Sequence, residues 1–309
     1  MNPVKGNKNE IQFRNYLNGV TNEYLSLKKH SSYLLHLVTL KRIDKYLKLT
    51  AQENILLVQI KSSFIEYYKI FLKTNLKLSY NSIIVEIMRI KNIINKAIAD
   101  EIIDIKDNPF ENIKANYLKS KKIFLNEKEF KLLANYTIDY KTSDDLYRDL
   151  YIFSSECGGL RSGEIIKLKN KNFDGEYLNI KSKFIDRRIK IPNRSLSILY
   201  KYLDQSKNED DFLFPIRNNI IISDTLEGKK KIDRIIKIMN ISIKKTALKV
   251  GIKKHVTFNT SRHTFATRAL NKGIPVEIVQ KLMGHMNIKE TLAYKNLVDI
   301  EVDQIMDKI

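Results

Sequence analysis

Apolar positions in the first hundred residues recur at the spacing of amphipathic helices. The first helix is predicted from about Glu10, and its apolar face repeats every three or four residues, at Phe13, Tyr16, Leu17, Val20 and Tyr24. The same periodicity returns after short polar breaks and predicts further helices over residues 31–49, 60–75 and 79–103. Four helices with short connections favour a compact helical bundle.

Pro109 interrupts this pattern. It stands at the start of a basic, loosely patterned segment, and proline ends a helix because it lacks the backbone N–H and clashes with the preceding turn. We therefore expect a helical domain over residues 1–105, a linker over 106–122 and a second domain over 123–309. The second domain is expected to close with an amphipathic helical tail at about residues 299–309.

The second half of the chain mixes helical and strand patterns. Asn126 and Glu129 have the spacing of a capping box before an apolar run. Further helices are predicted over about 145–156, 194–206 and 229–251. Between them, two short alternating strands surround a turn at about 184–186. The expected fold class is mainly α with a small β-hairpin, an α+β arrangement.

The net charge indicates what kind of partner the protein binds. Lys and Arg total 55 against 35 Asp and Glu, which gives a formal net charge of +20 and a pI of about 9.6. Such an excess is typical of proteins that bind a polyanion, most often nucleic acid. A lysine-rich coding bias explains part of the excess, but it does not place arginine beside histidine.

The cysteine content and the length of the apolar runs indicate the cellular compartment and whether the protein contacts a membrane. The single cysteine, Cys157, excludes an internal disulfide and a Cys-based zinc cluster, and we interpret it as a core residue of a protein in the reducing cytoplasm. The polar start lacks an apolar signal core, and no apolar run approaches the roughly 18 residues that span a bilayer. We expect a cytoplasmic protein with no membrane partner.

Two helices of the first half carry basic residues that could follow a DNA backbone. The predicted DNA-binding residues are Lys41, Arg42 and Lys45 on the second helix and Arg89, Lys91 and Lys96 on the fourth. Evenly solvated faces would look similar, so the pattern alone leaves both interpretations open. Three aromatic residues of the third helix are interpreted as core rather than as base-stacking platforms: Tyr67, Tyr68 and Phe71.

The stretch from Thr257 to Tyr294 concentrates side chains suited to phosphodiester chemistry. It holds an Arg-His pair at Arg262 and His263, a Gly-His turn ending at His285, and Tyr294 nine residues later. Helical patterns separate these groups and could gather them on one surface. Far upstream, Arg161 follows two glycines at the start of a helix, with Glu164 one turn on. On spacing alone, an exposed arginine with a solvated glutamate is an equal interpretation.

In their order and spacing, these pieces resemble the tyrosine recombinase (phage integrase) family, especially Xer-like and conjugative-element integrases. The pieces are GGLRSGEI, a lysine-bearing hairpin, SRHTFAT, LMGH and the late tyrosine. The resemblance covers almost the whole chain. It implies that the helical N-terminal half is a SAM-like core-binding domain and that the second half is the catalytic domain.

The resemblance assigns roles to individual residues. Arg161 and Arg262 match the two catalytic arginines, whose planar, permanently charged groups bind the nonbridging phosphate oxygens. Tyr294 matches the nucleophile that forms a 3′-phosphotyrosyl bond. His285 matches the residue that hydrogen-bonds the phosphate or the nucleophile.

Four further positions complete the implied site. Lys183 best matches the hairpin lysine that protonates the leaving 5′-oxygen, with Lys181 as the alternative because the hairpin is about one residue longer than usual. Glu164 matches the acidic buttress, and His263 matches a histidine that is more structural than chemical. Asn259 is a departure, because the family usually has histidine three residues before the second arginine. Asparagine can donate a hydrogen bond but cannot carry a proton.

The implied reaction is site-specific DNA recombination by an enzyme that needs no cofactor, because the phosphotyrosyl ester conserves the energy of the cleaved bond. The implied partner is a double-stranded recombination site, bound by four protomers that exchange strands through a Holliday junction. The tail either docks on a neighbouring protomer or packs back on its own domain, and a second recombinase or host factor is left open. Two alternatives remain at this point: a DNA-binding accessory protein that has lost catalysis, as Asn259 would suggest, and a type IB topoisomerase.

Overall fold

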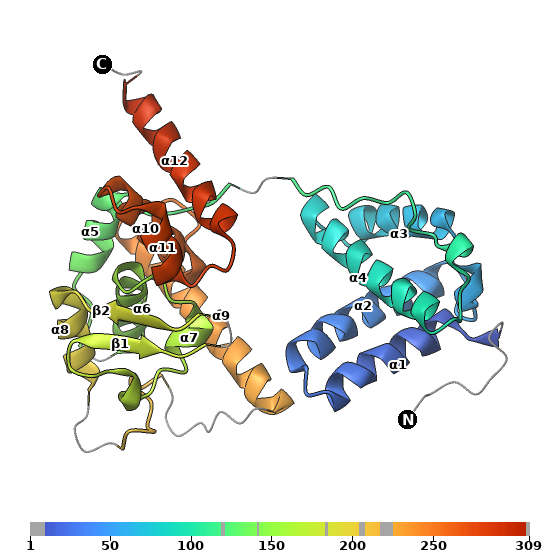
Figure 1. The fold of residues 1–309 in the computed structure, drawn as a ribbon, viewed down its shortest axis with the longest axis horizontal. Coiled ribbons are helices and arrows are strands. Elements are labelled where there is room, and N and C mark those ends of the chain that lie inside the picture. The colour runs from blue at the N-terminus through green and yellow to red at the C-terminus, as the bar shows by residue number, and fades with distance from the viewer. Residues whose placement is uncertain are drawn as a thin grey trace. The chain divides into compact units, whose positions relative to one another are not determined.

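The chain forms two units, each with its own hydrophobic core. The computed structural model describes residues 10–118, 121–140, 142–182, 185–203, 208–216 and 225–306 (Figure 1). The first unit comprises residues 1–120 with 224–229, and the second comprises residues 121–223 and 230–309.

The first unit is built on four helices. They are α1 (Phe13–Ser26), α2 (His30–Leu49), α3 (Ser62–Thr74) and α4 (Tyr80–Ala99), with short 3-10 turns η2 (Leu57–Gln59) and η3 (Ile105–Asp107). Helix α1 packs against α2, α3 packs against α4, and α2 also contacts α4 (Figure 1). The apolar periodicity in the sequence thus corresponds to four packed helices.

Aromatic side chains fill the centre of this unit. The ring of Tyr46 lies 5.2 to 5.3 Å from the rings of Phe64, Tyr68 and Phe71. Tyr68 and Phe71 are buried, as predicted, but the interpretation of Tyr67 as a core residue is wrong, because its side chain is 65% exposed. The buried positions of α3 follow the 64-65-68-71-72 spacing of one helix face, and Tyr67 lies off that face.

The segment after α4 packs on the same core. Phe110 is fully buried there, Ile113 packs beside it, and Ser62 Oγ donates to the carbonyl of Pro109 at 3.1 Å. Asn81 holds the later part of the segment, since its side chain exchanges two hydrogen bonds with the backbone of Leu118. The domain boundaries drawn from the sequence stay a prediction, but the packed part of the first unit extends beyond residue 105.

The second unit is mainly helical with one two-stranded sheet. Its elements are α5 (Glu127–Asn135), α6 (Ser143–Glu156), α7 (Ser162–Ile165), η4 (Asn170–Asn172), β1 (Tyr177–Ile180), β2 (Arg187–Lys190), α8 (Asn193–Tyr202), α9 (Leu226–Lys249), α10 (Phe258–Asn271), α11 (Val276–Met283) and α12 (Ile288–Met306). The predicted capping box at the start of α5 is present, with Asn126 and Glu129 each accepting from the other's backbone N–H.

Helices α6 and α10 lie against each other in the centre of this unit. Most side chains of both helices are buried, so their polar groups must pair within the protein. Tyr151 bonds Thr260 Oγ1 at 2.9 Å, and Ser154 Oγ bonds Ser261 Oγ at 2.6 Å. These buried bonds fix the register of α10 and so place Arg262, the next residue along.

The hairpin shows how strand alternation directs one arginine inward. Strands β1 and β2 are antiparallel, with Ile180 opposite Arg187 and Tyr177 opposite Lys190. Successive side chains of a strand point to opposite faces, and on β2 Arg187 and Ile189 are buried while Arg188 is exposed. Arg187 therefore points into the protein from the first position of its strand.

The late tyrosine and the predicted tail belong to one helix. Helix α12 runs without interruption from Ile288 to Met306 and extends from the rest of its unit (Figure 1). The sequence pattern predicts a helical tail at about residues 299–309 and leaves open how it connects to the segment that carries Tyr294. The structure joins the two in a single helix.

The structure also tests the interpretation of Cys157 as a core residue and the search for membrane-spanning segments. Cys157 is fully buried at the end of α6, and burial raises the pKa of its thiol, as expected for a core residue. Within the described residues, no helix is both long and apolar enough to cross a membrane.

Candidate active site

Arg262 is the structural centre of the candidate site. Its guanidinium is buried, with Nη1 donating to the carbonyl of Gly159 at 2.7 Å and Nη2 donating to the carbonyl of Met283 at 2.8 Å. Burial, and then the charge of Arg161, lower the pKa of Arg262 to about 10, so the group stays charged at neutral pH. Two of the five guanidinium N–H groups tie α10 to two other segments.

A glycine pair lets the chain approach Arg262 closely. Gly158 and Gly159 both have positive φ, at 71° and 61°. A Cβ on Gly159 would lie 3.2 Å from Arg262 Cγ, and one on Gly158 would lie 2.7 Å from the carbonyl oxygen of Leu282. Only glycine fits these two positions, and the turn they form brings Arg161 to the same region.

Arg161 is exposed at the start of α7 and adds positive charge to the cluster. Its charge lowers the pKa of Arg262 and contributes to lowering that of His285, so all three groups lie within electrostatic reach of one another. Glu164 accepts a hydrogen bond from the backbone N–H of Arg161 at 2.7 Å, which caps the short helix. Its other carboxylate oxygen accepts from Arg187 Nη2.

The sequence pattern does not identify Arg187 as a site residue, although this arginine contacts the site directly. It is buried, it pairs with Glu164, and its Nη1 lies 3.4 and 3.5 Å from the carbonyl oxygens of Leu282 and Met283. The acidic buttress predicted from the sequence thus anchors Arg187 through its side chain. Arg187 lies two residues before Ile189, so both side chains point to the same, buried face of the strand. This alternation is a sequence signal that could identify Arg187.

Gly284 ends α11 in the left-handed conformation, with φ of 65°. A Cβ there would lie 3.1 Å from Arg187 Nε. We expect Gly284→Ala to lower the unfolding free energy by about 1–2 kcal/mol from backbone strain and to displace Arg187 as well. Gly273→Ala is the matched control, since Gly273 also has positive φ but open space around it. Denaturant unfolding checks both, and equal losses would contradict the contact with Arg187.

Tyr294 is buried and hydrogen-bonded to a histidine of α10. Its hydroxyl lies 2.7 Å from His263 Nδ1, and the other ring nitrogen of His263 lies 3.1 Å from Asn259 Nδ2. Burial raises the pKa of Tyr294, against the opposing charges of Arg262 and Arg161. Burial also lowers the pKa of His263 to about 4, with Lys122 and Arg262 adding to the effect, so this histidine is neutral at pH 7.

His285 is a second histidine beside the nucleophile candidate. Its ring is parallel to that of Tyr294, with a centroid distance of 6.3 Å and an interplanar angle of 3°. Its Nδ1 is 2.8 Å from Thr291 Oγ1, and Nε2 is 3.8 Å from Glu290 Oε2. Burial, followed by the charges of Arg262 and Arg161, lowers its pKa to about 3.

Lys122 is a second residue that the sequence did not identify. Its Nζ lies 3.6 Å from the centroid of the Tyr294 ring and 3.5 Å from the carbonyl oxygen of Glu290. A cation over an aromatic face is attracted by the ring quadrupole. Burial lowers the pKa of Lys122, and the charge of Arg262 adds to this. No local signal could have found the contact, because it joins segments far apart in the chain.

The hairpin lysines are the remaining part of the predicted site. Lys183 lies outside the described residues. Lys181 follows directly after β1 and is exposed. The choice between them as general acid therefore stays a prediction.

In the first unit, two of the predicted DNA-binding residues share one buried carboxylate. Glu86 is fully buried and accepts from Arg42 Nη1 at 2.7 Å and from Arg89 Nη1 at 2.8 Å. Arg89 also donates to Thr39 Oγ1 at 2.9 Å. A buried carboxylate needs such partners. Both arginines therefore stabilise the contact between α2 and α4, whatever else they bind.

The four predicted lysines have different surroundings. Lys91 donates to the backbone carbonyls of Phe110 and Ile113, and Lys96 pairs with Glu23 at 3.3 Å. Lys41 and Lys45 are exposed, one turn apart on α2. These two lysines are the most accessible of the predicted DNA-binding set.

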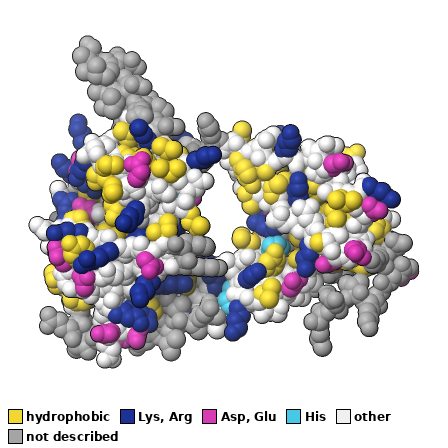
Figure 2. Space-filling view, in the orientation of Figure 1, with side chains coloured by type: hydrophobic (Ala, Val, Ile, Leu, Met, Phe, Trp, Pro, Cys, Tyr) yellow, Lys and Arg dark blue, Asp and Glu magenta, His cyan; other side chains and the backbone are white. Residues whose placement is uncertain are grey.

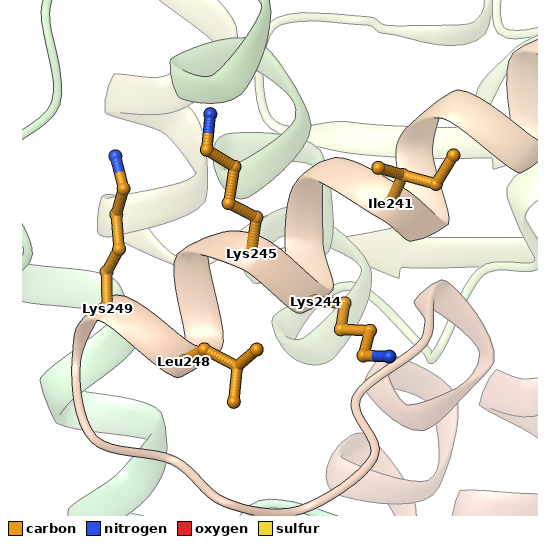
Figure 3. Close-up of a pocket in the computed structure, with 5 residues that line it drawn as sticks. All are labelled: Ile241, Lys244, Lys245, Leu248 and Lys249. Atoms are coloured by element: carbon orange, nitrogen blue, oxygen red, sulfur yellow. The ribbon is translucent and has the colours of Figure 1, made fainter.

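The remaining positive charge is distributed widely. On the visible face, Lys and Arg side chains are interspersed with acidic and apolar ones over both units (Figure 2). A hollow on α9 is lined by basic and apolar side chains together: Ile241, Lys244, Lys245, Leu248 and Lys249 (Figure 3). None of these five residues belongs to the arginine–histidine–tyrosine cluster, which remains the candidate active site.

Comparison with known proteins identifies the family. The sequence pattern of the phage integrase family matches residues 124–299, and that of the phage integrase SAM-like domain matches residues 12–114. The chain belongs to the phage integrase family. It is similar to the tyrosine recombinase of Pseudothermotoga lettingae, with 27% identity over 301 residues, which cover 92% of this chain and 97% of the relative. It is also similar to the recombinase XerA of Pyrococcus horikoshii, with 28% identity over 54% of this chain and 56% of that protein.

Solved structures show that the fold is shared. A lambda integrase dimer bound to a COC′ core site matches with a TM-score of 0.70 at 15% identity, over 92% of this chain and 95% of that one. The Tn1549 transposon integrase in complex with circular intermediate DNA matches with a TM-score of 0.63 at 20% identity, again over 92% and 95%. The predicted fold class and family are confirmed, and this chain is a tyrosine recombinase, an enzyme that transfers DNA strands.

Proposed function

We propose that this recombinase cleaves and rejoins double-stranded DNA at specific sites, with Tyr294 as the nucleophile. The observation that carries the assignment is the position of Tyr294, whose phenol lies within the electrostatic reach of Arg262 and Arg161. A phenol is a weak nucleophile at its ordinary pKa and needs positive charge close by. The arginines supply that charge at the place where a phosphate would bind.

In the proposed reaction, the arginines bind the phosphate and the tyrosine attacks it. Arg161 and Arg262 bind the nonbridging oxygens and stabilise the charge that builds on them in the transition state. Tyr294 Oη attacks phosphorus, forms the 3′-phosphotyrosyl ester and releases the 5′-oxygen. That oxygen takes a proton from the hairpin lysine, Lys183 or Lys181. Attack of a 5′-hydroxyl on the ester then reseals the strand.

His285 and Glu164 take supporting roles in this proposal. His285 packs against the ring of Tyr294, and its neutral imidazole is available to hydrogen-bond the phosphate. Glu164 holds the backbone of Arg161 and the side chain of Arg187. It acts by positioning these cations.

The assembly and location of the enzyme are also proposals. Four protomers would bind two DNA sites and exchange strands through a Holliday junction, with the end of α12 docking on a neighbouring protomer. The lambda integrase and Tn1549 integrase structures contain DNA, which supports a DNA partner for this chain. We place the protein in the cytoplasm, where such a partner would be reached.

A trapped covalent adduct tests the proposal. The wild-type protein is incubated with a nicked suicide substrate made from DNA that flanks its gene, so that cleavage releases a short strand and religation fails. We expect an adduct in which the DNA 3′-phosphate is attached to the peptide containing Tyr294, as read by mass spectrometry. Site binding without cleavage would favour the alternative raised by Asn259, an accessory DNA-binding protein. An adduct on another tyrosine would show that the nucleophile is misassigned.

The exposed lysines of α2 give a separate prediction about DNA binding. Replacing Lys41 and Lys45 together by alanine should weaken binding at all sequences and reduce the slope of log affinity against log salt by about 2, roughly one for each phosphate that is no longer neutralised. The matched control is the double replacement of Lys61 and Lys69, which removes the same charge from exposed ion pairs with Asp107 and Glu66. Equal effects of the two double variants, measured by titration at several salt concentrations, would contradict a DNA-facing surface on α2.

A further inference from the structure

His263 is placed to act on the nucleophile itself. Its Nδ1 is 2.7 Å from Tyr294 Oη, the atom that would attack phosphorus, and the two rings are 5.5 Å apart. Asn259 stands one helical turn before His263 on α10, so the two side chains share a face. The three residues form one continuous hydrogen-bonded chain from the helix surface to the buried phenol.

The orientation of the Asn259 amide sets the direction of this chain. Asn259 presents Nδ2 to His263 Nε2 at 3.1 Å, and an amide nitrogen can only donate. His263 Nε2 is therefore the acceptor and carries no proton. A neutral imidazole holds its single proton on the other nitrogen, so Nδ1–H donates to Tyr294 Oη. The neutral state itself is favoured by burial and by the nearby cations, which lower the pKa of His263.

We propose that Asn259 holds His263 in the Nδ1–H tautomer and that His263 is a catalytic residue, which donates a hydrogen bond to Tyr294 Oη and stabilises the phenolate as it attacks. This inference rests on the proposed function of Tyr294. During the step, the Oη–P bond forms, the P–O5′ bond breaks, the phenolic proton leaves to water, and the 5′-oxygen takes a proton. His263 keeps its own proton throughout. Asparagine at position 259 then has a function that does not require it to carry a proton.

Several charged or titratable groups besides His263 face Tyr294. They come from every surrounding segment: Arg161 before α7, Arg262 on α10, His285 after α11, Glu290 on α12 and Lys122 from the segment before α5. Variants at position 263 leave all of these in place. A change in the pH dependence of cleavage between such variants therefore reports the hydrogen bond at Oη.

Two substitutions at one position separate the hydrogen bond from a structural role. In His263→Ala the donor is lost, and the single-turnover rate of adduct formation should fall about 10- to 100-fold, as expected for a hydrogen bond to a developing charge. The rise of the rate with pH should move upward by about one to two units. In His263→Asn an amide N–H can occupy the place of Nδ1–H, and the rate and pH profile should recover to within about fivefold of wild type.

The outcomes of these experiments test the role of His263 separately from the role of Tyr294 as nucleophile. Asparagine cannot act as a base, so a His263→Asn variant as slow as His263→Ala would overturn the donor role. Wild-type rates in both variants would overturn any catalytic role. If the wild-type protein itself forms no adduct at Tyr294, the proposed function fails, and the inference fails with it.

The tautomer can be measured without activity. The chain has five histidines, and ¹⁵N NMR of the labelled full-length protein, with His263→Asn to assign the signal, reports which ring nitrogen carries the proton. We expect a protonated Nδ1 at neutral pH in the wild type, and a mixture of tautomers in Asn259→Ala. A proton on Nε2 in the wild type would overturn the proposal even if the His263 variants are slow.

Discussion

Tyr294→Phe is expected to abolish covalent adduct formation and to leave DNA binding intact. Phenylalanine keeps the ring that stacks on His285 and lies beneath Lys122, and it removes only the hydroxyl. Loss of a nucleophile that nothing else can replace should reduce cleavage by more than about a thousandfold. Single-turnover assays on the suicide substrate measure the effect.

The fold should change little in this variant. The lost hydroxyl leaves the buried Nδ1–H of His263 without its partner, which costs about 1–2 kcal/mol of unfolding free energy. Tyr202→Phe is the matched control, since it removes another buried hydroxyl of the same unit, bonded to Asp149 at 2.9 Å. The control should lose similar stability and keep its cleavage activity. If both variants lose cleavage equally, the effect comes from packing and Tyr294 is not the nucleophile.

Arg262→Lys should be nearly as damaging although it keeps the positive charge. The guanidinium spans the carbonyls of Gly159 and Met283 with two of its five N–H groups. A lysine ammonium is a single point of charge and cannot hold both carbonyls while it faces a phosphate. We expect cleavage to fall roughly 10²- to 10³-fold, the loss typical of removing one donor to a developing charge.

Arg268→Lys on the same helix is the control for this substitution. Arg268 pairs with Glu127 at 2.8 Å and stacks on the ring of Phe130, away from the predicted catalytic residues, and lysine can keep the charge pair. Its cleavage rate should stay close to that of the wild type. Rates measured at saturating DNA separate the chemical step from binding. An Arg262→Lys variant as active as Arg268→Lys would show that the bidentate geometry is not needed.

Local signals predicted the elements that depend on local chemistry. The capping box at Asn126 and Glu129 and the alternation around the hairpin turn both appear where expected. Ser31 and Ser32 are of the residue type that caps helices, yet α2 begins before them, at His30. Serine near a helix start is a weak signal when neighbouring residues already continue the turn.

The part of the candidate site that could be predicted from the sequence is the part that the family motifs contain. Arg161, Arg262, His285 and Tyr294 were chosen from those motifs, and the structure brings all four together. Their individual roles stay predictions until variants are measured.

The sequence did not predict the partners that hold this cluster in place. Lys122 reaches the ring of Tyr294 from a segment interpreted as a linker, and only the folded chain makes that contact. The family motifs do not predict the bond between His263 and Tyr294 either, because they imply a structural role for His263. Pairings between distant segments depend on packing, which no local pattern encodes.

Helix α12 is continuous, so a displacement of its far end would also displace Tyr294. Met306 lies about 18 Å from Tyr294 along the axis, at 1.5 Å per residue, and a helix has no joint within that length unless its hydrogen bonds break. A force applied to the far end by a neighbouring protomer would therefore tilt or turn the segment that holds Tyr294 against His263 and His285. Two glycines inserted between Tyr294 and the end of the helix would make α12 flexible there. The tail could then still bind a neighbouring protomer, but this binding would no longer change the position of Tyr294. Under the proposed assembly, binding of a neighbouring protomer at the end of α12 would therefore be coupled to the position of Tyr294.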